Sequence, residues 1–155
     1  METTLVLVKP DGVQRRLVGR ILARFEEKGL QVVGLRLMRL ERPLLEKHYG
    51  AHRGKPFYEG LVTYMASSPV VAIALRGKGA VPVVRKMMGA TFGSKAEPGT
   101  IRGDFAISDG FNLVHGSDSP EAAAKELEIF FGAGGVVDWK PGDMDWVYDV
   151  SDGVR

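Results

Sequence analysis

The residues best suited to chemistry in this 155-residue chain are His115-Gly116-Ser117-Asp118, one histidine followed by small and polar residues. Ser119 and Pro120 come next, and both are typical of a helix N-terminus. We therefore expect His115 at the end of an extended segment, beside free backbone N–H groups that suit a phosphate. Imidazole can attack phosphorus at neutral pH, so the stretch predicts a phosphate-carrying nucleophile. The alternative is a histidine that only makes structural hydrogen bonds.

Glu126 is the second residue that points to chemistry, and it lies within the helix expected from Pro120. Its neighbours three and four positions away are all apolar, so its carboxylate should face the protein interior. An unpaired buried charge is costly, and His115 is a suitable partner, with Ser117 linking the two. A carboxylate that holds one imidazole nitrogen leaves the other as the nucleophile. Alternatively, Glu126 lies at the edge of the helix with its carboxylate in water.

Three cations could serve a phosphate site. Lys9 follows the first predicted strand, Arg85 lies on a predicted helix, and Arg102 lies in a long loop. If they converge on His115 they form a triphosphate clamp, because guanidinium forks match phosphate oxygens and an ammonium adds a point charge. Each alone is more often a solvated surface charge, and spacing does not show convergence.

Four smaller signals fit the same hypothesis. Tyr49 could donate a hydrogen bond to a phosphate near the histidine, and Thr91 and Asn112 suit phosphate or ribose hydroxyls. Phe57 follows a Lys-Pro turn; such a ring is usually part of a core, but it could also stack on a nucleotide base.

The composition predicts one domain over residues 1–155. There are 21 basic and 19 acidic residues, so net charge gives no nucleic-acid signature, and there is no cysteine for disulfides or thiol catalysis. The N-terminus has no basic region followed by an apolar run, and no apolar run has the length of a membrane span. We therefore expect a cytoplasmic protein that needs neither a membrane nor a nucleic acid.

The sequence lacks the motifs of other common nucleotide sites and offers only a weak metal pair. No P-loop or G-x-G-x-x-G motif occurs. His48 and His52 are four residues apart, but Gly50 separates them and no third ligand is near. We expect no metal bound by protein ligands.

The hydrophobic pattern alternates strands with helices, which predicts an αβ sandwich in which helices pack on one sheet. A long irregular loop is expected over 89–103, and Trp139, Trp146 and Tyr148 are expected to anchor the C-terminal tail. The predicted strands are 3–8, 33–37, 70–75, 105–107 and 112–114. The predicted helices are 18–28, 43–48, 57–65, 80–88 and 120–131.

Several of these stretches together resemble the nucleoside diphosphate kinase family. The resemblance runs from Thr4 to about Tyr148. It rests on Lys9-Pro10-Asp11-Gly12-Val13, Thr100-Ile101-Arg102-Gly103-Asp104, Asn112-x-x-His115-Gly116-Ser117-Asp118, His48-Tyr49, Phe57 with Leu61, Arg85, and Asp145-Trp146-Val147-Tyr148.

The resemblance implies a ferredoxin-like αβ sandwich with an antiparallel four-stranded sheet. It implies transfer of the γ-phosphate of a nucleoside triphosphate to a nucleoside diphosphate through a phosphohistidine at His115, by a ping-pong mechanism with broad base specificity. Mg²⁺ would be carried by the nucleotide, and the assembly would be a homohexamer or a tetramer. The implied catalytic set is His115, Glu126, Ser117 and Tyr49; the implied substrate-binding set is Lys9, Phe57, Leu61, Arg85, Thr91, Arg102 and Asn112.

One position departs from the family pattern, and two other functions remain as alternatives. After Thr91 the family commonly has Asn-Pro, whereas this chain has Phe92-Gly93, which predicts a freer loop and a less rigid assembly. An RNA-binding module on a similar sheet would carry an aromatic RNP strand, and none occurs. A nucleotide sensor would keep the cationic clamp without needing His115 paired with Glu126.

Overall fold

One antiparallel four-stranded sheet forms the centre of the protein, seen in a computed structural model that describes residues 1–154. Its strand order is β2-β3-β1-β4. The two inner strands are the most continuously apolar segments, TTLVLV and VVAIAL, because both of their faces are covered. The strands are β1 (Glu2–Val8), β2 (Gln31–Met38), β3 (Val70–Gly77) and β4 (Val114–Gly116). This order and the intervening helices confirm the predicted ferredoxin-like sandwich.

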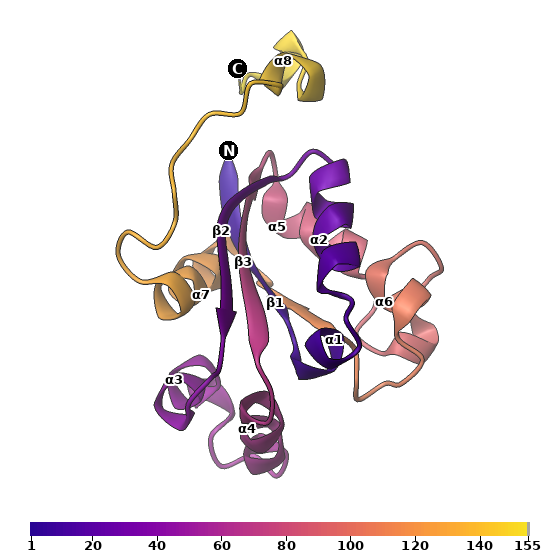
Figure 1. The fold of residues 1–155 in the computed structure, drawn as a ribbon, viewed down its shortest axis with the longest axis vertical. Coiled ribbons are helices and arrows are strands. Elements are labelled where there is room, and N and C mark those ends of the chain that lie inside the picture. The colour runs from indigo at the N-terminus through magenta and orange to yellow at the C-terminus, as the bar shows by residue number, and fades with distance from the viewer. Residues whose placement is uncertain (155) are drawn as a thin grey trace.

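Helices cover both faces of the sheet (Figure 1). Val6 and Val8 of β1 pack with α2 and α5, whereas Leu5 and Leu7 point to the opposite face and pack with α3, α4 and α7. The helices are α1 (Pro10–Gln14), α2 (Val18–Glu27), α3 (Arg42–His48), α4 (Tyr58–Ala66), α5 (Ala80–Met88), α6 (Ile101–Phe105), α7 (Pro120–Phe131) and α8 (Met144–Val147). Short 3-10 turns occur at Gly50–His52, Gly93–Lys95 and Val150–Asp152. Within residues 1–154, no helix is both long and apolar enough to cross a bilayer.

The segment before the last strand differs from the prediction. Residues 105–107 are not a strand: Phe105 ends α6, and Ile107 is 92% exposed. The hydroxyl of Thr100 caps α6 by accepting a hydrogen bond from the Gly103 N–H at 3.0 Å, so the predicted loop ends in a helix. The last strand, predicted at 112–114, lies two residues later, so His115 is inside it.

The C-terminal tail follows β2 and ends near the start of β1 (Figure 1). The indole N–H of Trp139 donates to the Val32 carbonyl at 3.0 Å, and the Tyr148 hydroxyl accepts from the Lys78 N–H at 3.1 Å. These two predicted anchors therefore hold the tail. Trp146 is not an anchor, because it is 91% exposed on α8.

Candidate active site

His115 is placed by strand pairing on one side and by a helix start on the other. It pairs with Leu7 of β1 at the centre of β4. Ser119 then caps α7, its hydroxyl accepting from the Ala122 N–H at 3.0 Å, and Pro120 occupies the first turn. The ring is half-buried and lines a cavity of about 310 Å³. The nucleophile candidate thus lies at the centre of β4, four residues before the cap of α7.

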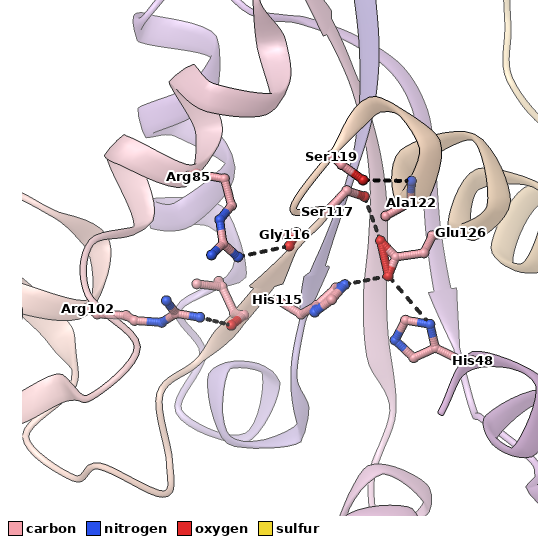
Figure 2. Close-up of polar contacts among 10 residues, drawn as sticks. His48, Arg85, Arg102, His115, Gly116, Ser117, Ser119, Ala122 and Glu126 are labelled. Carbon is pink, nitrogen blue, oxygen red and sulfur yellow. Dashed lines mark hydrogen bonds and ion pairs between the residues drawn. The ribbon is translucent and has the colours of Figure 1, made fainter. Parts of the chain in front are cut away.

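The carboxylate of Glu126 is shared between His115 and Ser117 (Figure 2). Its Oε2 lies 2.7 Å from His115 Nε2, and its Oε1 accepts from the Ser117 hydroxyl at 2.6 Å. Burial alone would raise the pKa of the Glu126 carboxyl, but the hydrogen bonds with His115 and from Ser117 lower it. Because a carboxylate accepts, the proton must be on His115 Nε2, and Nδ1 keeps its lone pair.

His48 is a member of this group that sequence reasoning missed. Its Nδ1 lies 3.6 Å from Glu126 Oε2, and its side chain is 4% exposed. Burial and the nearby His115 lower the pKa of His48 to about 4, so the ring is neutral at pH 7. In the sequence, His48 stands out as a weak metal pair with His52 and as part of the His48-Tyr49 motif, and neither pattern predicts its contact with Glu126. Its position on the inward face of α3, three residues after the buried Leu45, is the signal that could have found it.

His48, His115 and Glu126 are also the residue types that bind divalent cations, and their ligand atoms lie within 4.8 Å of one another. The 2.7 Å contact between His115 and Glu126 is, however, hydrogen-bond geometry. In this structure the group therefore orients the His115 ring through a hydrogen bond to Glu126.

Both arginines approach β4 from the same side, near His115 (Figure 2), and donate to the carbonyls of Gly116 and Val114. Arg85 is exposed on α5 and donates to the Gly116 carbonyl at 3.3 Å. Arg102 is 5% exposed, and burial together with the charge of Arg85 lowers its pKa to about 10, which leaves it charged at pH 7. Arg102 Nε, Nη1 and Nη2 donate to the backbone carbonyls of Asn112 (3.1 Å), Gly89 (3.0 Å) and Val114 (2.7 Å).

Lys9, Thr91 and Asn112 are connected to Arg102 rather than to the cavity itself. Burial lowers the pKa of Lys9; Asp11 opposes this shift and Arg102 adds to it, so the two cations are close enough to interact. The Asn112 amide donates to the Thr91 carbonyl at 2.8 Å. Its Oδ1 is buried and accepts no hydrogen bond from the described residues, so it is available to a ligand hydroxyl or ammonium.

The remaining predicted residues lie on and before α4. Tyr49 lines the cavity and packs on His48, with ring centroids 4.4 Å apart, and burial raises the pKa of its hydroxyl. Phe57 is 52% exposed at the start of α4, with the His52 ring at 5.3 Å. Leu61 is half-buried on the same helix. Phe57 thus offers an open aromatic face, not a core position.

Comparison with known proteins decides the family. The family model described as nucleoside diphosphate kinase matches residues 2–136. A nucleoside diphosphate kinase of Pelotomaculum thermopropionicum is 54% identical over 149 residues, which cover 96% of this chain and all of the relative. That of Thermosynechococcus vestitus is 52% identical over 150 residues, 97% of this chain and all of the relative. The chain belongs to the nucleoside diphosphate kinase family.

Solved structures of nucleoside diphosphate kinases share this fold. The enzyme of Halobacterium salinarum, solved in complex with CDP, is 47% identical with a TM-score of 0.92, over 96% of this chain and 99% of that one. A nucleoside diphosphate kinase family protein of Babesia bovis is 38% identical, also with a TM-score of 0.92, over 96% of this chain and 100% of that one. These matches confirm the resemblance, the fold and the enzyme class: the protein is a nucleoside diphosphate kinase-type enzyme that transfers phosphate between nucleotides.

Proposed function

We propose that His115 Nδ1 carries the γ-phosphate of a nucleoside triphosphate to a nucleoside diphosphate. The contact between His115 Nε2 and Glu126 supports this assignment most directly, because it leaves Nδ1 as the one ring nitrogen with a free lone pair. In the first half-reaction Nδ1 bonds to the γ-phosphorus, the bond to the bridging oxygen breaks, and the diphosphate leaves. In the second, a terminal oxygen of another diphosphate bonds to that phosphorus and Nδ1 is released.

The cations around β4 would stabilise the charge that spreads over the transferring group's oxygens. Arg102 uses three of its five N–H groups on backbone carbonyls, which leaves two for phosphate. Arg85 uses one on Gly116. In this proposal Lys9, Arg85, Thr91 and Arg102 bind phosphates, Tyr49 bonds near the histidine, Asn112 binds the sugar, and Phe57 and Leu61 contact the base.

Mg²⁺ would be carried mainly by the nucleotide. Both oxygens of Glu126 are taken by His115 and Ser117, and the exposed Asp118 lines the same cavity. The residues present therefore suit an ion that keeps most of its ligands on phosphates. When bound, it neutralises phosphate charge and helps hold the transferring group in line.

A labelling experiment tests the phosphohistidine. Incubation with γ-labelled ATP and no acceptor should place acid-labile, base-stable label on the protein, and His115→Ala should take up none. Initial rates with both nucleotides varied should give parallel double-reciprocal lines, because one site serves each in turn. Intersecting lines would indicate a ternary complex and direct transfer. A nucleotide sensor would bind ATP without taking up label.

Broad base specificity follows if the base contacts only Phe57 and its neighbours, since any base can stack on a ring. We expect kcat/KM for ADP, GDP, CDP and UDP to lie within about two orders of magnitude, because discrimination without hydrogen bonds to base edges is modest. A strong preference for one base would reveal a residue that reads its edge.

We further infer a single domain over residues 1–155 that assembles as a homohexamer, or a tetramer, in the cytoplasm, and needs no nucleic acid. The family resemblance supports this, and β2 is an edge strand with exposed Leu35 and Leu37, a surface suited to a second copy. Sedimentation measures the assembly, and cell fractionation the location.

A further inference from the structure

The three residues before His115 form a strained turn. Leu113 is fully buried and has a φ of +72°, which is uncommon for a side chain with a Cβ. The Val114 N–H donates to the Asn112 carbonyl at 2.8 Å, so the hydrogen bond spans two residues with Leu113 between them. A positive φ inside such a bond marks the rarer, more strained form of γ-turn. Strain of this kind persists only where the surroundings over-determine it.

Residues at the start of α1 bind both the N–H and the carbonyl of Leu113. Asp11 Oδ2 accepts from the Leu113 N–H at 3.0 Å, and the Lys9 N–H donates to the Leu113 carbonyl at 2.8 Å. The carbonyls of the two flanking residues accept from Arg102. Of these partners, Asp11 is the one side chain that binds Leu113 itself.

Tyr64 fixes the Asp11 carboxylate. Its hydroxyl donates to Asp11 Oδ1 at 2.5 Å and accepts from the Asp11 N–H at 3.3 Å. Burial and the bond to Asp11 raise the pKa of Tyr64, so the hydroxyl remains a donor at neutral pH. One oxygen of Asp11 thus serves Tyr64 and the other serves Leu113.

We propose that Asp11 is a positioning residue, whose carboxylate holds the turn at Leu113 so that Asn112 and His115 face the same nucleotide. The inference rests on the proposed function, in which Asn112 binds the sugar and His115 receives the phosphate. Without the carboxylate the Leu113 N–H loses its acceptor, and the residue can relax toward negative φ. That rotation moves Asn112 relative to His115, which β1 pairing keeps in place.

Two phosphoryl donors separate positioning from simple support of the fold. ATP needs both the sugar contact and His115, whereas phosphoramidate has no sugar or base and needs His115 alone. For Asp11→Ala we expect His115 phosphorylation by ATP to fall about 10- to 100-fold, the size of effect that small misplacements produce. Phosphorylation by phosphoramidate should fall less than about threefold. Tyr64→Phe, which keeps the bond to Leu113, should stay within about threefold with both donors.

A second pair of variants covers the case in which Asp11→Ala does not fold. Asp11→Asn keeps one acceptor oxygen. When that oxygen accepts from the Tyr64 hydroxyl, the amide N–H₂ group faces the Leu113 N–H, so the ATP rate should fall. Adding Tyr64→Phe removes that hydroxyl and should restore much of that rate. Amide exchange at Leu113 should quicken in Asp11→Asn and slow again in the double variant, while Ile73 in β3 stays unchanged.

The outcomes distinguish failure of the proposed phosphate transfer through His115 from failure of the positioning role of Asp11. If the wild-type protein takes no label from either donor, the proposed function fails. If it does, but Asp11→Ala keeps its ATP rate or loses both rates equally, or Asp11→Asn keeps its ATP rate while amide exchange at Leu113 quickens, Asp11 is not a positioning residue.

Discussion

The ring of His48 meets the ring of His115 edge to face, with centroids 5.1 Å apart and ring planes at 89°. Both imidazoles approach the same oxygen, Glu126 Oε2, His115 at 2.7 Å and His48 at 3.6 Å. One buried carboxylate thus faces two rings, and the low pKa of His48, about 4, keeps that ring neutral at pH 7.

The pH dependence of folding tests this arrangement. His48 is harder to protonate in the folded protein (about 4) than in the unfolded chain (6.5), so its contribution is fully present above pH 6.5 and lost as pH falls toward 4. The loss can reach about 3 kcal/mol. His48→Phe should flatten the fall of the free energy of unfolding in this window, measured by urea titration at fixed protein concentration. His52→Phe, at a less buried ring, should keep the wild-type slope; an unchanged slope in His48→Phe contradicts the argument.

The sequence predicts His115 and its partner Glu126 better than it predicts the residues that pack around them. Apolar neighbours of Glu126 are enough to turn it inward, and the cap at Ser119 places His115 near the helix start. The edge-to-face packing of His48 depends on how α3 docks against α7, which no local pattern reveals. The wrong strand at 105–107 has a related cause: Phe-Ala-Ile has strand propensity, but the Thr100 cap ends the preceding segment as a helix.

Arg102 binds backbone carbonyls and is also proposed to bind phosphate, so its substitution should affect both stability and nucleotide binding. Arg102→Ala removes the donor of three backbone carbonyls, so we expect the free energy of unfolding to fall by about 2–4 kcal/mol in addition to weaker nucleotide binding. Arg102→Lys should also be less stable than the wild type, because the compact lysine ammonium cannot reach the three carbonyls that the planar guanidinium binds.

Arg85→Ala is the matched control. Arg85 is exposed and makes one contact of 3.3 Å, so its loss should raise KM and lower kcat with little change in the urea midpoint. Equal stability losses in Arg85→Ala and Arg102→Ala would show that the carbonyl contacts of Arg102 contribute little.

Gly93 is fixed by close packing, so its interpretation as a source of loop freedom was wrong. A Cβ there would lie 2.5 Å from the Ala106 carbonyl oxygen and 2.7 Å from that of Ser108. Gly93→Ala must push this backbone apart, and we expect a loss of about 1–3 kcal/mol, seen as a melting temperature several degrees lower. Gly110→Ala, where the nearest atom is 4.0 Å away, should melt near the wild-type temperature. If both variants have the same melting temperature, the close packing at Gly93 does not contribute to stability.

Glu126 should act on the rate of phosphate transfer and not on nucleotide affinity. Its carboxylate contacts His115, Ser117 and His48, and among the described residues no hydrogen bond or ion pair joins it to Lys9, Arg85 or Arg102. Glu126→Ala frees His115 Nε2, so the ring can rotate or carry its proton on Nδ1, where it blocks attack. We expect kcat to fall about 10- to 1000-fold with KM nearly unchanged.

Ser117→Ala is the graded comparison for Glu126→Ala. It leaves the 2.7 Å contact between Glu126 and His115 and removes one hydrogen bond to the carboxylate, so kcat should fall by about tenfold or less. Nitrogen-15 NMR of the imidazole gives a readout that a loss of stability would not produce: the proton should be on Nε2 in the wild type and in Ser117→Ala, and shared between both nitrogens in Glu126→Ala. His115→Ala sets the baseline of no label. A Glu126→Ala protein that keeps its rate and tautomer but melts earlier would make Glu126 a purely structural residue.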